Sequence, residues 1–564
     1  MKYGLVLHTP EHNISFDMYS SKQKTVNLSP FFAHISYKKE SIYEIYDITI
    51  SSVTKQKIYV SLTGEGDADF YSFHGLCKKE RIFRQSPHDP LQCHFKMEKS
   101  AVPMVAAVKD GKADIFISDN PSYFDNATTQ HIIPEEHRFY LSSGDKGGMP
   151  NCPESKVFDP IYHEIGGENT HTFRFIAFQA DVSDLKGIRR EAFLAIEKIW
   201  GTGSHSHYRA MCFAGNYMHI RKNETKRSDK WIVAGIEYSN MQYFRDAFYQ
   251  SMILDEEMQE QSYRALDYEF DHAENPLIYL IWSYRVVKQG KTHNKERADH
   301  AWETVLACME KFEPHDSYYP NAKEGGDFRC WFDTCAFDAD DVDLYNQGLL
   351  VCALESAKRL GYDIGDRKEK ALRKYHSLFN GKYFPLSQKK QCMALDFTVG
   401  EVLYYLLFDE LFIDQTMFEK SYRKVCDSAA KTKYGIKIVA AEDGSYAPIE
   451  TFMSGDYLYF GFETMDVGRY QNGGSWHLYE MLFHIAGYLH GMHDAEQNLI
   501  DRLLIDLDYG GATYEYMHTI KGNGVKANQG WNASIYAIWE ELIRRGKADD
   551  AFFKAADAKI ASLG

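Results

Sequence analysis

Residues 183–204 read SDLKGIRREAFLAIEKIWGTGS, and they separate two parts of the chain that have different hydrophobic periods. Ser183 is a suitable N-cap, and the glycines of 201–204 would end a helix. The spacing therefore predicts a helix over 183–200 that links the two parts. Its apolar residues recur every three or four positions, the period of an amphipathic helix: Leu185, Ile188, Ala192, Ile196 and Ile199.

Before this helix the apolar residues alternate with polar ones. The alternation runs through 46–51 and again through 58–62, and a hairpin is predicted across 109–112 between strands at 105–108 and 114–117. Period-two alternation with one polar face is typical of antiparallel sheets packed face to face. Residues 1–180 are therefore predicted to form a β-sandwich.

After about residue 240 the pattern is helical, so the whole chain is predicted to be a multidomain α+β protein. Residues 181–235 are interpreted as a linker with one helix. Residues 236–564 are interpreted as an (α/α)6 barrel, because the helices number about twelve and pair across short connections. A solenoid is the alternative, but no sequence repeats at a fixed period. The predicted spans are 241–256, 274–289, 296–312, 342–361, 367–380, 397–411, 416–431, 473–491, 494–507, 530–545 and 549–562.

The composition limits the kinds of partner. The 564-residue chain has a formal net charge of -16, whereas a nucleic-acid binder needs a basic face. No apolar stretch approaches the ~18 residues of a transmembrane helix, and the run Leu5–Leu7 is shorter than a signal-peptide core. A cytoplasmic protein that binds neither nucleic acid nor membrane is expected. Aromatic residues, at 15%, suit stacking on sugar rings, although large cores account for the same share.

Two predicted loops, 313–341 and 508–529, interrupt the helices, and loops of this length often carry function. The first contains GDFRCWFDTC at 326–335, in which Asp327 and Asp333 are candidate general acids. Burial against Trp331 would favour the protonated form that a general acid requires. The aspartates that follow are interpreted as a solvated run and a helix N-cap: Asp338, Asp340, Asp341 and Asp343.

Three further clusters combine carboxyl, amide and aromatic groups. The second loop carries Glu515 in TYEYMH (513–518), followed by QGWNAS at 529–534; a lone Glu is more often a surface charge, but the aromatic setting makes this one a candidate. The sequence YQNGGSWH at 470–477 leads into an apolar helix, with a turn and a core Trp as the alternative. In FRDAF (244–248), an adjacent Arg and Asp could grip sugar hydroxyls or form a surface ion pair.

These four clusters, in this order, resemble the six-hairpin glycosidases over roughly residues 240–545. The chain is most similar to the amylo-α-1,6-glucosidase domain of glycogen debranching enzymes and to glycoside hydrolase family 63. The resemblance implies Asp333 as the general acid in a Trp-x-Asp element and Glu515 as the base. Some members of these glycosidase families carry the general acid in a Gly-x-Asp element, which matches Asp327 instead. Asp327 is therefore the alternative to Asp333 as the general acid. The resemblance also implies a substrate pocket lined by Arg245, Asp246, Trp331, Tyr470, Asn472, Trp476, Gln529 and Trp531.

An inverting, exo-acting glycosidase is therefore expected, with the two carboxyl groups roughly 6.5–9.5 Å apart. No cofactor or metal is expected, because the chemistry needs none and no HExxH, phosphate-loop or dinucleotide motif occurs. Alternatives are a glycoside phosphorylase, in which Arg329 would help to bind phosphate, a polysaccharide lyase that uses Tyr and His, and a non-catalytic carbohydrate-binding protein. The sequence leaves the sugar, its anomer and the oligomeric state open.

Overall fold

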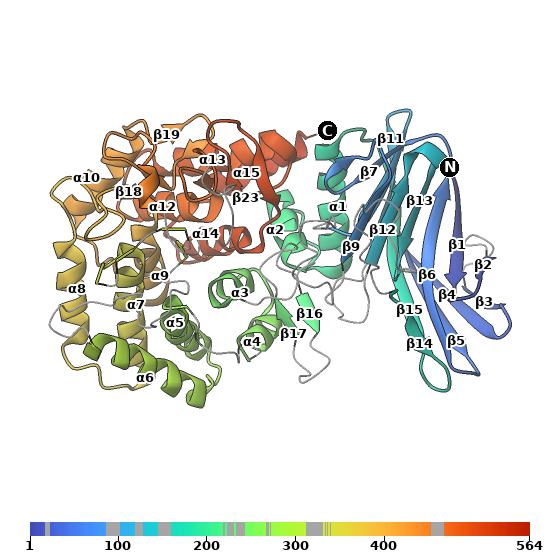
Figure 1. The fold of residues 1–564 in the computed structure, drawn as a ribbon, viewed down its shortest axis with the longest axis horizontal. Coiled ribbons are helices and arrows are strands. Elements are labelled where there is room, and N and C mark those ends of the chain that lie inside the picture. The colour runs from blue at the N-terminus through green and yellow to red at the C-terminus, as the bar shows by residue number, and fades with distance from the viewer. Residues whose placement is uncertain are drawn as a thin grey trace. The chain divides into compact units, whose positions relative to one another are not determined.

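The chain divides into two compact units in a computed structural model. The first comprises Met1–Gln242, Gly510–Ala512 and Asp557–Gly564, and the second comprises Tyr243–Tyr509 and Thr513–Ala556. Strands dominate the first unit and helices the second, which confirms a mixed α+β, multidomain chain (Figure 1). The structure describes residues 1–16, 23–85, 102–118, 128–144, 160–217, 220–222, 230–232, 243–264, 266, 270, 272–311, 331–332, 334–335, 337–338, 340–452 and 467–563.

The first unit contains two antiparallel sheets. The strands are β1 (Lys2–His8), β2 (Asn13–Phe16), β3 (Gln23–Asn27), β4 (Phe31–Glu40), β5 (Tyr43–Ser52), β6 (Gln56–Glu65), β7 (Asp69–Ser72), β8 (Gly75–Leu76), β9 (Arg81–Gln85), β10 (Met104–Lys109), β11 (Lys112–Ser118), β12 (Thr128–Ile133), β13 (Arg138–Ser142), β14 (His163–Ile165) and β15 (His171–Ala180). The 7-stranded sheet has the order β2-β1-β6-β13-β12-β9, with β14 paired to β6. The 8-stranded sheet has the order β3-β4-β5-β15-β11-β10-β7-β8.

The period-two alternation in the sequence marks the buried faces of these sheets. Ile48 and Ile50 of β5 and Val60 and Leu62 of β6 belong to the same hydrophobic cluster, although the two strands lie in different sheets. The predicted hairpin is also confirmed, since Lys109 of β10 pairs with Lys112 of β11. Apolar residues of the two sheets therefore share one core.

The predicted helix 183–200 is confirmed as α1 (Leu185–Trp200), with Gly201 as its C-cap. Its N-cap is Asp184 rather than the predicted Ser183, because the Asp184 carboxylate accepts a hydrogen bond from the backbone N–H of Gly187. A second helix, α2 (His207–Tyr217), was not predicted. No helix within the described ranges combines the length and the apolar character that a membrane crossing requires.

Helices of the second unit form a closed series of contacts. Each of α3, α5, α7, α9, α12 and α14 contacts the next member of this series, and α14 contacts α3. We call these helices the ring helices. Their bounds are α3 (Phe244–Ser251), α5 (Glu274–Lys288), α7 (Leu344–Leu360), α9 (Val399–Phe408), α12 (His477–Leu489) and α14 (Ser534–Arg544). The helices that follow them in sequence are α4 (Glu256–Arg264), α6 (Lys295–Lys311), α8 (Arg367–Ser377), α10 (Gln415–Cys426), α13 (Ala495–Gly510) and α15 (Ala551–Ala561).

Burial distinguishes the two sets of helices. Almost every residue of α7 is buried, as expected of a helix enclosed by its neighbours, whereas α8 buries only Ala371 and Tyr375. The ring helices α7 and α9 approach so closely that a Cβ atom on Gly400 would lie 2.3 Å from the carbonyl carbon of Gly348. Glycine at this position therefore permits the contact.

Several sequence predictions in this unit were wrong in detail. The predicted helix 416–431 ends at Cys426, and the predicted helix 530–545 begins as an α-helix only at Ser534. The predicted helix 241–256 is shorter, and α4 follows it as a separate helix. The predicted helix 473–491 begins at His477, since the preceding residues form turns and the strand β22 (Ser475–Trp476). The segment 508–529 is not an irregular loop, because β23 (Tyr514–Met517) and β24 (Gly524–Ala527) pair with each other, and β23 also pairs with β22. Other short strands of this unit are β18 (Met393–Ala394), β19 (Lys431–Thr432), β20 (Gly435–Ile436) and β21 (Val439–Ala440), whereas β16 (Ile220–Lys222) and β17 (Lys230–Ile232) belong to the first unit.

Candidate functional site

The candidate residues gather where the ring helices begin. Arg245 and Asp246 lie in the first turn of α3, and Glu274 is the first residue of α5. Asp396 opens the 3-10 helix η5 (Asp396–Thr398), which leads directly into α9. Trp531 lies in η8 (Gly530–Ala533), which leads into α14. Side chains from segments far apart in the sequence therefore meet at one end of this helix series.

A chain of buried polar contacts joins the FRDAF motif (244–248) to Trp331 of the GDFRCWFDTC motif. The guanidinium of Arg245 donates from Nη1 to Glu274 Oε1 at 2.5 Å. The other carboxylate oxygen of Glu274 accepts the backbone N–H of Trp331 at 3.0 Å, and the indole Nε1 of Trp331 donates to Asp396 Oδ2 at 2.9 Å. Glu274 and Asp396 were not predicted as site residues, yet they connect the start of α3 to the Trp331 segment.

Aromatic rings link Trp331 to the other clusters. The Trp331 ring stacks on Tyr479 with centroids 3.8 Å apart and lies 5.1 Å from Trp476. Trp476 in turn lies 6.0 Å from Trp531 and 5.0 Å from Tyr470. The guanidinium carbon of Arg245 lies 5.1 Å from the centre of the Trp531 ring. These rings, together with Arg245, are called the aromatic cluster below.

Glu515 is on β23 and is only 2% exposed. Its Oε2 lies 3.3 Å from Nζ of Lys526, which is on β24. Asp246 is also buried, and this burial raises the pKa of its carboxyl group to about 6; Arg245 opposes the rise, whereas the negative charges of Glu515 and Glu274 add to it. Gln529 Nε2 donates to Asp246 Oδ1 at 3.4 Å. The Arg-Asp motif and the Glu515 region therefore belong to one electrostatic environment.

Two further carboxyl groups are held in protonated or partly protonated form. Burial raises the pKa of Asp396 to about 8, even though the hydrogen bond from Trp331 favours its ionised form. Burial likewise raises the pKa of Asp343 to about 7, against the hydrogen bonds that it accepts from Asn346. At neutral pH much of the negative charge expected in this region is therefore absent.

The predicted solvated run of aspartates was partly wrong. Asp343 is the N-cap of α7, as predicted, but it is buried. Asp341 is buried as well, and its carboxylate accepts the Ser387 hydroxyl and the Lys389 backbone N–H. Only Asp338 and Asp340 are exposed, where both contact the Lys389 ammonium. A second segment, 387–390, covers the run, and this contact could not be read from the aspartates alone.

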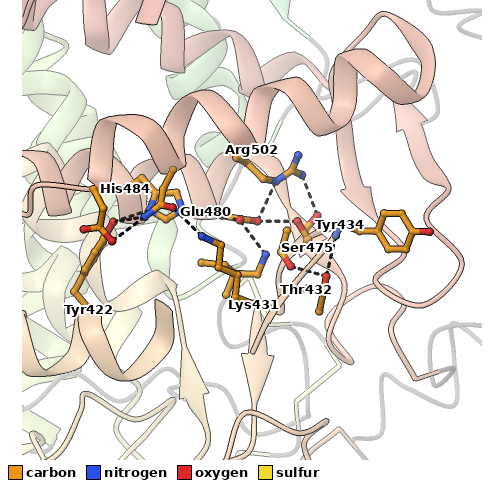
Figure 2. A network of polar contacts seen from close by, with 12 residues as sticks. Tyr422, Lys431, Thr432, Tyr434, Ser475, Glu480, His484 and Arg502 are labelled. Carbon is orange, nitrogen blue, oxygen red and sulfur yellow. Dashed lines mark hydrogen bonds and ion pairs between the residues drawn. The ribbon is translucent and has the colours of Figure 1, made fainter. Parts of the chain in front are cut away.

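A buried network of polar side chains contacts the backbone of β22 and β23. Figure 2 shows it running from Tyr422 through His484 and Glu480 to Arg502. The Arg502 guanidinium donates to Glu480 Oε2 at 2.9 Å and to Asp506 Oδ1 at 2.7 Å, and its Nη2 reaches the carbonyl of Ser475. Burial raises the pKa of Asp506, but Arg502 and His477 outweigh this effect, so the pKa stays below its usual value.

This network reaches the residues next to two motif side chains. Asp506 Oδ2 contacts Nδ1 of His477 at 2.7 Å and accepts the backbone N–H of Tyr514 at 3.3 Å. His477 follows Trp476, and Tyr514 precedes Glu515 in the chain. Arg502 and Asp506 therefore fix the backbone that presents both motif side chains.

The structure brings most of the predicted site residues together. Arg245, Asp246, Trp331, Tyr470, Trp476, Glu515, Gln529 and Trp531 all take part in the contacts given above. Asn472 is buried in the neighbouring turn, where its carbonyl accepts the Gly468 N–H at 2.8 Å. The surface interpretations of the Arg245–Asp246 pair and of Glu515 were wrong, since these side chains are largely or fully buried. Asp327, Asp333 and Arg329 lie outside the described residues.

Glu274 and Asp396 carried little sequence signal. An acidic residue in the first turn of a helix is the usual complement to the helix dipole, so Glu274 resembled an ordinary cap. Asp396 stands alone between Leu395 and Phe397, without a neighbouring motif. Within the described part of the chain, no three His, Cys, Asp or Glu side chains are grouped so that they could hold a metal ion.

Comparisons with known proteins give weak structural likenesses. No family model and no curated protein matches the chain. A solved glycosidase, in its wild-type form, is 11% identical, with 64% of this chain and 98% of that chain covered and a TM-score of 0.40. A GH63 mannosylglycerate hydrolase from Thermus thermophilus, in complex with Tris, is 11% identical, with 53% of this chain and 94% of that chain covered and a TM-score of 0.37.

The same enzyme in complex with glucose is 14% identical, with 36% of this chain and 48% of that chain covered and a TM-score of 0.27. In that comparison the match spans about half the length of the solved chain. Family 63 is one of the two groups that the four sequence motifs resemble. Identities and TM-scores this low assign neither an activity nor a substrate.

Proposed function

We propose that the protein is a glycoside hydrolase that acts by inversion at chain ends of an oligosaccharide or glycoside. In this proposal Asp333 is the general acid, with Asp327 as the alternative, and Glu515 is the general base. The observation that carries it is the convergence of four separate motifs on the aromatic cluster. Glu515 and Asp246 share one electrostatic environment, and Trp331, two residues before Asp333, packs in the aromatic cluster.

The proposed architecture is a β-sandwich over 1–180, a linker over 181–235 and an (α/α)6 barrel over 236–564. Two antiparallel sheets with a common core support the sandwich. The ring helices, whose contacts return from α14 to α3, support the barrel. Site residues at the N-terminal ends of several ring helices are what a catalytic end of such a barrel requires.

The side chains suit the two proton transfers of a single displacement by water. A protonated carboxyl group must give its proton to the leaving oxygen, while an ionised one removes a proton from the attacking water. The ammonium of Lys526, 3.3 Å from Glu515, favours the ionised carboxylate that a base needs. In this proposal Arg245 and Asp246 supply donors and acceptors for sugar hydroxyls. Trp331, Trp476 and Trp531 are each less than 5% exposed and pack against neighbouring rings, so they support these polar side chains.

The test is hydrolysis of a panel of aryl glycosides and oligosaccharides by the wild-type chain and by Glu515→Gln. Turnover by the wild type is expected, with NMR of the first product showing the inverted anomer. Glu515→Gln should lose at least about 1,000-fold in kcat, at the strong end of acid–base effects, while it stays folded. The control is Glu419→Gln, an exposed position on α10, which should keep full activity.

The other outcomes decide between the remaining functions. Near-normal turnover by Glu515→Gln would contradict the base assignment. Turnover that requires added phosphate would indicate a phosphorylase, and binding without product release would indicate a non-catalytic carbohydrate-binding protein. A parallel comparison of Asp333→Asn with Asp327→Asn identifies the acid, since only the variant of the true acid should lose activity on substrates with poor leaving groups.

A further inference from the structure

Gln471 is buried in the turn that leads to β22, and its amide group bonds to Trp331 and Thr334. Its Oε1 accepts the backbone N–H of Thr334 at 3.0 Å and the Thr334 hydroxyl at 2.6 Å. Its Nε2 donates to the carbonyl oxygen of Trp331 at 2.7 Å. One side chain therefore bonds to the backbone before and after the pair 332–333.

The Trp331 end of this segment is fixed by two more side chains. Glu274 accepts the backbone N–H of Trp331, and Asp396 accepts its indole N–H. With the carbonyl held by Gln471, the backbone donor, the backbone acceptor and the ring donor of Trp331 all have buried partners. Trp331, Phe332 and Thr334 are each less than 5% exposed, so little water competes for these bonds.

The turn that carries Gln471 is itself constrained. Tyr470 has a φ of 45°, in the left-handed region that non-glycine residues seldom adopt. Its carbonyl accepts the Gly474 N–H at 2.9 Å and the Trp476 indole N–H at 3.0 Å. A Cβ on Gly474 would lie 2.5 Å from that carbonyl oxygen. Strained backbone of this kind persists only where surrounding contacts hold it, and it often does so near functional sites.

We propose that Gln471 is a positioning residue for the general acid. It bonds to the backbone on both sides of Asp333 and does not itself act on the substrate, so it orients the segment that delivers the proton. This inference rests on the proposed glycosidase function and on Asp333 as the acid. Gln471 was not among the site residues predicted from the sequence.

Leaving groups of different acidity separate this role from a purely structural one. A poor leaving group such as phenoxide or a sugar alkoxide departs only if the acid protonates it, whereas dinitrophenolate or fluoride departs unaided. Gln471→Ala should therefore lose roughly 100-fold in kcat/KM on phenyl glycosides, as expected for a misplaced catalytic group. On dinitrophenyl glycosides or glycosyl fluorides of the same sugar it should stay within a few-fold of wild type.

Two further variants serve as references for the size of the effect of Gln471→Ala. Gln471→Glu keeps the acceptor for Thr334 but loses the donor to Trp331, so it should fall between wild type and Gln471→Ala. Gln347→Ala removes another fully buried glutamine, one that donates to the carbonyl of Ala371, and should show no dependence on the leaving group. If Gln471→Ala is not recovered folded, Gln471→Asn is measured by the same criterion.

The possible results are distinct. Selective loss on poor leaving groups in both Gln471→Ala and Asp333→Asn supports the proposal. Equal loss on both substrate classes, or no loss, overturns it. Selective loss in Asp327→Asn but not in Asp333→Asn also overturns it, because the acid would then lie outside the held segment. A wild-type chain that hydrolyses neither class fails the glycosidase proposal itself.

Discussion

Replacing Asp246 by Asn should change how the stability of the protein depends on pH. The carboxyl group is 2% exposed, and its pKa is raised from 3.8 to about 6, chiefly by burial. Between these pH values the folded protein binds a proton that the unfolded chain has released. The free energy of unfolding therefore falls as the pH rises from about 4 to about 6.

The size of this effect follows from the two pKa values. At 1.36 kcal/mol for each pKa unit, the difference between 3.8 and about 6 corresponds to about 3 kcal/mol. An amide does not titrate, so Asp246→Asn lacks this loss. Relative to wild type, the variant should gain about 2 kcal/mol between pH 4 and pH 7, because the carboxyl group of the unfolded chain is still partly protonated at pH 4.

Urea unfolding at pH 4 and pH 7, followed by tryptophan fluorescence, measures this difference. Asp246→Ala is the matched control, because it removes the same carboxyl group and should show the same gain from a lower absolute stability. A difference between wild type and Asp246→Asn that stays constant from pH 4 to pH 7 would refute the reasoning. Activity should fall in both variants even where stability rises, as is common when a site residue is replaced.

Two further changes test the packing around the site. Gly400→Ala should destabilise the protein by about 3 kcal/mol or more, since the added Cβ meets the Gly348 backbone at 2.3 Å. A thermal melt unchanged from wild type would show that α7 and α9 can separate. The control is Gly4→Ala, where the nearest atom to an added Cβ lies at 3.7 Å. Arg502→Met should cost about 3–5 kcal/mol, because it leaves Glu480 and Asp506 buried without their cation. A loss below about 1 kcal/mol in urea unfolding would mean that the network rearranges around the missing charge.

Some helices were predictable to within two residues at each end, whereas the predicted helix 416–431 ends five residues earlier, at Cys426 of α10. The predicted helix 274–289 corresponds to α5, and 296–312 corresponds to α6. By contrast, β23 was not predicted, because its alternation is limited to Tyr514-Glu515-Tyr516 and all four of its residues are buried. A strand buried on both faces has no distinctive period, and its pairing with β22 is a long-range contact that no local pattern contains.

The motif residues were predictable, whereas the groups that hold them were not. Trp331 and Glu515 could be singled out from their neighbours in the sequence, but Glu274 contacts Trp331 across 57 positions and Gln471 contacts it across 140. Local sequence shows that Glu274 opens a helix and that Gln471 lies in a turn. It does not show which distant backbone atom each side chain will meet, since that depends on how the ring helices pack.

The charged side chains around Arg245 are better explained by a catalytic role of this region than by a contribution to stability. Among the described side chains there, two cations, Arg245 and Lys526, face three carboxyl groups, Asp246, Glu274 and Glu515. Buried charges cost free energy even when paired, and an excess of one sign costs more. Burial is the main cause of the raised pKa of Asp246, and the negative charges of Glu515 and Glu274 add to the rise. A core selected for stability alone would favour apolar side chains here, whereas a site that must hold one proton donor and one acceptor close together requires carboxyl groups in unlike environments.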